Sequence, residues 1–145
     1  MRFALKALGG TNRPQKQLEL KSYLEQKYRG KAVLLYKARE AITLALRSLD
    51  LPKNSAVAIN GYTCYAVYKA VTDAGCRPEY LDIADGGLNF SAQALKAALM
   101  RNPDIKAVII QNTLGFICDM ENISAICKER SLILIEDLAH SAGAV

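Results

Sequence analysis

The sequence predicts an α/β fold, a three-layer α/β/α arrangement with a mainly parallel sheet. Short apolar runs alternate with amphipathic segments of helix length, which is the pattern of repeated βαβ units. The apolar runs contain few polar residues, as expected of strands that helices cover on both faces. The chain has 145 residues, 51% of them hydrophobic and 23% charged, so we predict a single domain over residues 1–145 with a substantial core.

The predicted helices are recognised by apolar spacing and by the residues that begin or end them. Pro14 suits the first turn of a helix, and Gly30 ends the same segment. Gly75 ends a later helix, and Asn89 or Ser91 caps the one after it. The predicted helices cover about residues 14–29, 38–49, 63–74, 91–100 and 120–130.

The predicted strands are short apolar runs that precede or follow these helices. They cover residues 32–36, 56–59, 78–83, 105–110 and 132–135. The last strand is expected to be buried on both faces, and the chain ends shortly after it, so we expect an unfinished sheet edge. Right-handed crossovers between parallel strands bring the carboxyl ends of the strands to one edge of the sheet.

The charged residues argue against a nucleic-acid partner. The net charge is +5 and the isoelectric point is about 9.1, but cations and anions are mixed along the chain. A basic run at residues 27–31 is better explained as a solvated helix end, because cations stabilise helix C-termini. We therefore expect no nucleic-acid partner.

The cysteines and the N-terminal sequence predict the compartment. Cys64, Cys76, Cys118 and Cys127 form no CxxC pair and are expected to be reduced thiols. Residues 1–10 lack the apolar core of a signal peptide, and no apolar run is long enough to span a membrane. We predict a soluble cytoplasmic protein with no membrane partner.

Polar residues cluster at three predicted junctions between a strand and the segment after it. The first, residues 36–41, offers free backbone amides and Arg39 for a phosphate group. The second, residues 60–65, offers aromatic rings and hydroxyls. The third, residues 136–140, contains an acidic pair and His140, the only histidine. Since open α/β sheets bind ligands at this edge, a phosphorylated aromatic cofactor is indicated.

Other interpretations of these residues stay open. An aspartate after a strand often only caps a helix, and a single histidine is often a satisfied surface or core group. A Rossmann-type nucleotide site is less well supported, because no GxGxxG sequence follows any predicted strand.

In the order and approximate spacing of its motifs, the chain resembles the DegT/DnrJ/EryC1/StrS aminotransferases, which are pyridoxal-phosphate enzymes of fold type I. The motif that matches most specifically is the last one, residues 135–144. The other matching residues are 41–46, 57–64, 75–78, 81–83, 106–110, 112–115 and Asp119. The resemblance covers nearly all of this chain and implies the N-terminal part of the large domain of that fold.

The resemblance implies roles for individual residues in binding pyridoxal 5′-phosphate. Asp137 would pair with the pyridinium nitrogen, and His140 would lie near the phenolic oxygen. Ala38 and Arg39 match the turn that binds the phosphate, and Cys64 matches a position where many members have an aromatic residue stacked on the ring. A carboxylate at the ring nitrogen keeps that nitrogen protonated, so that the ring can accept electrons during transamination.

Two of these positions depart from the common pattern of the family. The phosphate turn usually has small residues, whereas here it reads Lys37-Ala38-Arg39, in which Arg39 can still neutralise a phosphate. Cys64 stacks poorly on a ring, which leaves Tyr62 or Tyr65 as alternatives.

The resemblance also implies that one essential group lies elsewhere. The Schiff-base lysine of the family lies beyond the point that matches Val145, so we expect no catalytic residue in this chain and no activity of the chain alone. The leading hypothesis is a fragment or truncated member of an aminotransferase that forms a homodimer and passes an amino group from an amino acid donor to a nucleotide-linked keto-sugar. The alternative is a non-catalytic truncated or split α/β module that acts by folding or dimerisation only.

Overall fold

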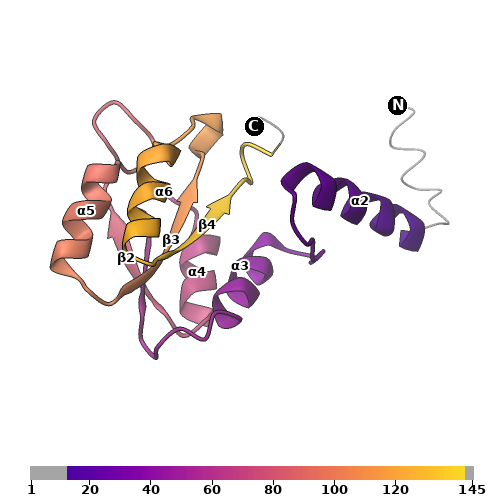
Figure 1. Cartoon of the computed structure of the whole chain (residues 1–145), viewed down its shortest axis with the longest axis horizontal. Coiled ribbons are helices and arrows are strands. Elements are labelled where there is room, and N and C mark those ends of the chain that lie inside the picture. Colours follow the sequence, from indigo (N-terminus) through magenta and orange to yellow (C-terminus); the bar gives the residue numbers. More distant parts are fainter. Residues whose placement is uncertain (1–12, 143–145) are drawn as a thin grey trace. The chain divides into compact units, whose positions relative to one another are not determined.

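The predicted strands from residue 56 onward form one parallel sheet. The computed structural model describes residues 13–142, and its strands are β1 (Ala56–Asn60), β2 (Arg77–Leu81), β3 (Ile105–Gln111) and β4 (Ile133–Asp137). Their order in the sheet is β2-β1-β3-β4, and every neighbouring pair is parallel (Figure 1). The predicted parallel α/β sheet is confirmed.

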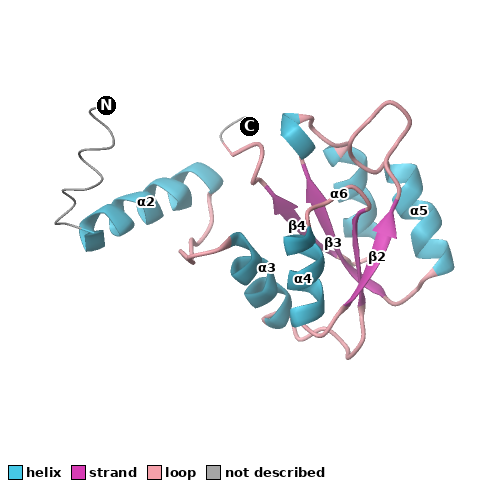
Figure 2. Ribbon diagram, turned by 180° about the vertical axis from the view of Figure 1, so that it is seen from behind, coloured by secondary structure: helices cyan, strands magenta, loops and turns pink. Residues whose placement is uncertain are grey.

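Two pairs of helices cover the two faces of this sheet. α3 (Ala38–Arg47) and α4 (Tyr65–Asp73) pack on one face, and α5 (Ala92–Arg101) and α6 (Met120–Glu129) pack on the other. Figures 1 and 2 show the sheet and these helices from opposite sides. The three-layer α/β/α arrangement predicted from the sequence is therefore also confirmed. Of the two residues proposed to cap α5, Ser91 is the cap, and its Oγ accepts a hydrogen bond from the Ala94 amide at 3.1 Å.

Successive residues of the central strands face the two apolar layers in turn. In β1, Val57 and Ile59 pack with α3 and α4, whereas Ala56 and Ala58 pack with α5 and α6. All four are at most 1% exposed, because helices cover this strand on both faces. The same double burial explains why no polar residue occurs in β1 before Asn60, its last residue.

The chain divides into two compact units, residues 1–36 and 37–145, and the sheet belongs to the second. The first contains α2 (Arg13–Tyr28), which has Pro14 in its first turn as predicted and no buried residue. The strand predicted over residues 32–36 is wrong, since the structure has no strand there. Apolar residues favour a strand only where a neighbour pairs with their backbone, and no strand within residues 13–142 pairs with this segment.

β4 is less buried than the sequence predicts. Ile133 is 38% exposed, and Leu134 and Ile135 are half-buried, so the expectation that this strand is buried on both faces is wrong. β4 lies at the end of the strand order, and no strand of the described part of the chain pairs with its outer side. Apolar content alone does not distinguish such an edge strand from a central one.

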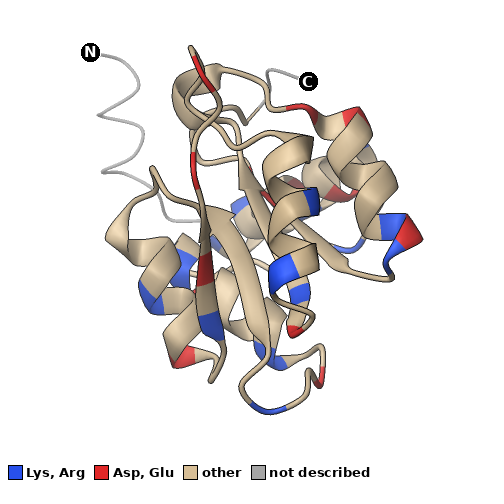
Figure 3. Ribbon diagram, turned by 90° about the vertical axis from the view of Figure 1, so that its left-hand side faces the viewer, with Lys and Arg blue, Asp and Glu red and all other residues tan. Residues whose placement is uncertain are grey.

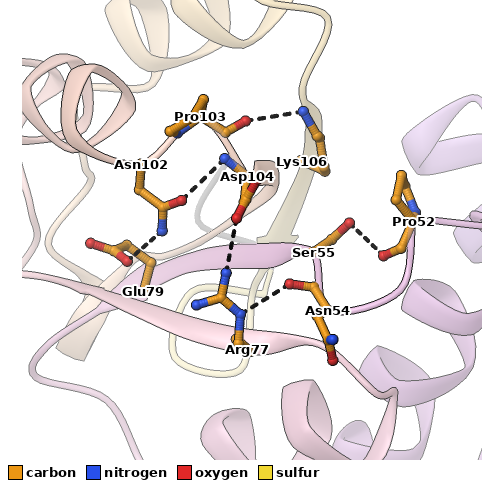
Figure 4. Close-up of polar contacts among 9 residues, drawn as sticks. All are labelled: Pro52, Asn54, Ser55, Arg77, Glu79, Asn102, Pro103, Asp104 and Lys106. Carbon is orange, nitrogen blue, oxygen red and sulfur yellow. Dashed lines mark hydrogen bonds and ion pairs between the residues drawn. The ribbon is translucent and has the colours of Figure 1, made fainter.

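Polar contacts hold the turns at the amino ends of the strands (Figure 4). Arg77 donates from Nε to the Asn54 carbonyl oxygen at 3.0 Å and from Nη2 to Asp104 Oδ2 at 3.2 Å. Asn102 Nδ2 donates to Glu79 Oε2 at 2.8 Å. The ion pair of Arg77 is exposed and contributes little stability, but together these contacts fix β2 to the turns that precede β1 and β3.

Lysine and arginine positions are interspersed with acidic positions (Figure 3). The basic run assigned to a helix end does lie at the end of α2, where Lys27 Nζ is 5.5 Å from the centre of the Tyr28 ring. Within residues 13–142, every helix is too short or too polar to cross a membrane. The expectation about a signal peptide concerns residues 1–10, which lie outside the described residues.

Candidate functional site

The candidate site lies where the connections of the sheet diverge. α4 follows β1 on one face of the sheet, and α6 follows the neighbouring strand β3 on the other face. The loops after these two adjacent strands therefore leave in opposite directions. Open α/β sheets bind their ligands in the crevice that forms at such a point, beyond the carboxyl ends of the strands.

Gln111, the last residue of β3, joins the loops on this edge. Its Nε2 donates to the Tyr62 carbonyl oxygen at 3.0 Å and to Thr113 Oγ1 at 2.8 Å. Its Oε1 accepts a hydrogen bond from Thr63 Oγ1 at 2.6 Å. One amide side chain thus fixes the loop after β1 to the loop after β3.

Asn112 makes the connection in the other direction, toward β4. It is 2% exposed. Its Nδ2 donates to Glu136 Oε1 at 3.1 Å, and its Oδ1 accepts a hydrogen bond from the Cys118 amide at 3.0 Å. The end of β4 and the far end of the loop after β3 are therefore held by one buried side chain.

Thr113 completes the set by bonding to the loop between β2 and α5. Its amide donates to Asn89 Oδ1 at 3.2 Å, and Asn89 Nδ2 donates in turn to the Phe116 carbonyl oxygen at 2.8 Å. Asn60, at the end of β1, donates from Nδ2 to the Leu88 carbonyl oxygen at 2.8 Å. The three residues after the apolar part of β3 thus fix the loops that follow β1, β2 and β3, and they also hold the end of β4.

A cavity of about 240 Å³ lies in the crevice. Its walls come from the loops after β1, β3 and β4. The lining residues are Tyr62, Thr63, Cys64, Gln111, Thr113, Leu114 and His140. Cys64 and His140, which the sequence predicts as site residues from distant parts of the chain, therefore meet at one cavity.

His140 is held by the loop after β3. Its Nδ1 accepts a hydrogen bond from the Leu114 amide at 3.1 Å. Leu114 lies within the 3₁₀ turn η1 (Thr113–Gly115) and has φ 52° and ψ 25°, a left-handed conformation that is uncommon for residues other than glycine. The turn thus presents a backbone donor to the only imidazole of the chain.

Asp137 ends β4 beside the same loops. It is aligned with Gln111 in the register of the sheet, and its Oδ1 accepts a hydrogen bond from the Ala139 amide at 3.0 Å. Further along this loop Ser141 is 4% exposed, and its Oγ has no hydrogen-bond partner among residues 13–142. A buried hydroxyl without a hydrogen-bond partner is unfavourable.

The predicted phosphate turn begins α3, away from the lining of the cavity. Ala38 is exposed, and Arg39 is half-buried and lines a separate hollow with Thr43 and Asp73. The side chain of Lys37, at the N-cap position, does not cap the helix. The amides of the first turn of α3 thus have no side-chain cap, as an anion site requires.

Tyr65, the other predicted site residue, also lies outside the cavity lining. It begins α4 and is 68% exposed, and its ring centre is 5.4 Å from that of Tyr68. Tyr62, the alternative ring considered from the sequence, does line the cavity.

Sequence reasoning missed the residues that organise this edge. The strand predicted from the sequence ends at residue 110, and residues 112–115 match the family without a role, so Gln111, Asn112 and Thr113 receive no function from the sequence. A signal was present, because they directly follow the predicted strand 105–110, which is apolar apart from Lys106. Polar side chains in that position lie at the carboxyl edge of a buried strand and need partners there.

The cysteine thiols of the sheet region differ in how deeply they are buried. Burial is the main cause that raises the pKa of Cys118, and the negative charge of Glu136 raises this pKa further. Burial also raises the pKa of Cys127. Cys64, in contrast, is exposed at the start of α4.

We expect iodoacetamide to label Cys64 at least about tenfold faster than Cys118 or Cys127 at neutral pH. The thiolate is the reacting form, and the two buried thiols combine a raised pKa with little access to reagent. Mass mapping of samples quenched over time measures the three rates. Cys64→Ser should abolish the fast phase, whereas rapid labelling of Cys118 in the folded chain would contradict the burial described here.

These observations first define a class of protein. A parallel α/β/α domain with a cavity at its diverging connections has the architecture of the doubly wound folds, which bind their ligands at this edge of the sheet. The chain belongs to the DegT/DnrJ/EryC1/StrS aminotransferase family, whose model matches residues 10–145. The resemblance stated from the sequence is confirmed.

Individual relatives cover most of this chain but only part of their own length. Protein MosB of Rhizobium meliloti is 35% identical over 105 residues, which are 72% of this chain and 20% of that protein. The UDP-N-acetyl-3-dehydro-alpha-D-glucosamine 3-aminotransferase of Acidithiobacillus ferrooxidans is 31% identical over 105 residues, 72% of this chain and 28% of that protein. A putative sugar aminotransferase from Streptococcus pneumoniae, solved in its PMP form, shares the fold with a TM-score of 0.79 and 24% identity, over 88% of this chain and 36% of that one. The chain thus spans 20% to 36% of the length of these proteins.

Proposed function

We propose that this chain is part of a pyridoxal-phosphate-dependent aminotransferase that transfers an amino group from an amino acid to a nucleotide-linked keto-sugar. The observation that carries the proposal is the cavity at the diverging strands, where Cys64 and His140 meet beside the strand that ends in Asp137. Family membership supports the reaction type. The Acidithiobacillus ferrooxidans relative, named for a UDP-linked dehydro-sugar, supports the acceptor, and the PMP form of the Streptococcus pneumoniae structure supports the cofactor.

The groups around the cavity fit a phosphorylated pyridine ring. Asp137 accepts a backbone hydrogen bond at Oδ1, and its other carboxylate oxygen suits a protonated ring nitrogen. His140 offers an imidazole at the cavity, and the Ser141 hydroxyl on the same loop has hydrogen-bonding capacity that the described part of the chain does not use. An anionic acceptor, a ring donor and a spare hydroxyl on one loop are the groups that such a heterocycle needs.

Each of these residues has a separate task in the proposed site. Pyridoxal phosphate supplies, when bound, an electron sink for the carbanion that forms during amino transfer. Asp137 would keep the ring nitrogen protonated, and His140 would hydrogen-bond the phenolic oxygen. Arg39 and the uncapped first turn of α3, which begins at Ala38, would hold the phosphate, and Cys64 would lie against the ring.

We expect the chain to bind pyridoxamine 5′-phosphate, and Asp137→Asn to weaken this binding by about tenfold or more. The substitution keeps the shape of the side chain but removes the charge that pairs with the ring nitrogen. Pyridoxamine phosphate is the suitable probe, because it carries an amine in place of the aldehyde and cannot label exposed lysines. Isothermal titration calorimetry measures the Kd of both proteins.

Asp82→Asn is the matched control for this experiment. Asp82 directly follows β2, at the same edge of the sheet, and it also accepts a backbone hydrogen bond, from the Ile83 amide at 2.9 Å. The control variant should bind the probe as tightly as the unchanged chain. Equal weakening in both variants, or no saturable binding to the unchanged chain, would favour the non-catalytic module instead.

We further propose a cytoplasmic location and assembly as a homodimer. The four cysteines are unpaired thiols, which supports a reducing compartment. The homodimer rests on the family resemblance alone and stays a prediction.

A further inference from the structure

We propose that Leu114 is a positioning residue. Its backbone amide donates a hydrogen bond to Nδ1 of His140, which keeps Nδ1 unprotonated and leaves the Nε2–H group to face the cavity. The part of this inference that concerns the ligand rests on the proposed function. The part that concerns the tautomer rests on the geometry of the chain alone.

The hydrogen bond between the two residues determines which ring nitrogen carries the proton. A backbone amide can only donate, so the Leu114 N–H at 3.1 Å needs a lone pair on His140 Nδ1. A neutral imidazole with a bare Nδ1 carries its proton on Nε2. Since Nδ1 is occupied by the amide, Nε2–H is the polar group that remains for a ligand.

The conformation of the loop aims this amide at the imidazole. Leu114 has φ 52° and its side chain is 66% exposed, so burial of the side chain does not account for the left-handed backbone. Two turn hydrogen bonds hold it instead, from the Gly115 amide to the Asn112 carbonyl oxygen and from the Phe116 amide to the Thr113 carbonyl oxygen, both at 3.0 Å. Asn112 and Thr113, which carry these carbonyls, are themselves held by hydrogen bonds. The Cys118 amide donates to Asn112 Oδ1, and the Thr113 amide donates to Asn89 Oδ1.

Both residues lie at the cavity, where the Nε2–H tautomer of His140 is available to a ligand. Leu114 and His140 line the same cavity, so an imidazole that the Leu114 amide holds in place lies beside whatever occupies the space. A fixed Nε2–H is a donor and suits an oxygen acceptor with negative charge, such as the phenolic oxygen of the proposed cofactor. A freely turning imidazole would present donor and acceptor nitrogens in turn, and would hold such an oxygen less well.

The test uses the 145-residue chain labelled uniformly with ¹⁵N. His140 is the only histidine, so a single pair of imidazole nitrogen signals is expected and needs no assignment by mutation. We expect a coupling across the hydrogen bond between the Leu114 amide nitrogen and Nδ1, a chemical shift typical of a bare nitrogen at Nδ1, and one typical of a protonated nitrogen at Nε2. Absence of the coupling, or a protonated Nδ1, would overturn the proposal.

Two substitutions separate the backbone of Leu114 from its side chain. Leu114→Gly keeps the N–H and adopts positive φ readily, so it should retain the coupling and the Nε2–H form. Leu114→Pro has no N–H and fixes φ near about −65°, so it should lose the coupling and allow both tautomers. A folded proline variant that keeps a single Nε2–H form would refute the role of the amide. If the proline variant does not fold, the coupling in the unchanged chain and in the glycine variant decides the question.

Binding of pyridoxamine 5′-phosphate to the same proteins tests the link to the ligand. The glycine variant should bind like the unchanged chain, and a folded proline variant about fivefold more weakly, the effect of one lost neutral hydrogen bond. Equal binding by both variants would overturn the positioning role. A failure of all proteins to bind would reject the proposed cofactor site in this chain, while the spectrum of His140 would still decide the tautomer.

Discussion

Replacing Ile59 with alanine is expected to lower the free energy of unfolding by about 2–5 kcal/mol. Ile59 is 0% exposed, and it lies in β1 between β2 and β3. Its side chain packs with α3 and α4, and the rigid sheet beside it cannot close the space left by the missing carbons. Urea unfolding followed by circular dichroism measures the loss as a shift of the midpoint at constant slope.

Ile133→Ala is the matched control for this substitution. Ile133 is also an isoleucine in a strand, but it is 38% exposed at the outer strand β4. Its replacement should cost about 1 kcal/mol or less, because its side chain is only partly removed from water. Equal losses in the two variants would contradict the assignment of β1 to the centre of the core.

Replacing Asn112 with alanine is expected to cost about 1–3 kcal/mol and to loosen the loop after β3. The substitution removes the acceptor of the Cys118 amide and the donor to Glu136 in one step. Cys118 is 9% exposed, so water cannot easily satisfy its amide. Urea unfolding gives the free energy, and hydrogen exchange of the Cys118 amide reports the local effect, which should be a clear acceleration.

Asn122→Ala provides the comparison, since Asn122 is an exposed asparagine of α6. Its Nδ2 donates to the carboxylate of Asp119 at 2.9 and 3.0 Å, at the surface, where water replaces a lost hydrogen bond at little cost. This variant should change the free energy of unfolding by about 0.5 kcal/mol or less. If Asn112→Ala proves as mild as this control, the loop is held by other contacts than the ones described.

The sequence was sufficient for the parts of the fold in which local pattern and burial agree. Residues 56–59 are uniformly apolar, and residues 105–110 are apolar except for the exposed Lys106, because helices cover both faces of β1 and most of β3. Both strands are predicted correctly. Helix ends were predicted within a few residues where glycine or a cap marks them, as at Gly75 and Ser91. The ordered motifs place Cys64 and His140 in one site, and both residues line the same cavity, while their roles toward a cofactor stay predictions.

Features that depend on which segments become neighbours could not be predicted in this way. Residues 32–36 have the composition of a strand, yet strand formation requires a pairing partner that a local pattern does not reveal. The outer position of β4 is likewise a property of strand order. Gln111 and Asn112 gain their importance from contacts with residues far away in the sequence, such as Thr63 and Glu136, and no periodicity encodes those contacts.

The strand order also sets the sequence in which this sheet can form. β1 and β2 are separated by one helix, whereas β3 follows β1 only after a second helix. Pairing of Ala58 with Val108 therefore closes a longer loop than pairing of Ala58 with Glu79, and longer loops lose more chain entropy before contacts form. The β1-α4-β2 unit should thus fold early, and the crevice between β1 and β3 should form in a later and slower step. The cavity in this crevice should therefore be completed only near the end of folding.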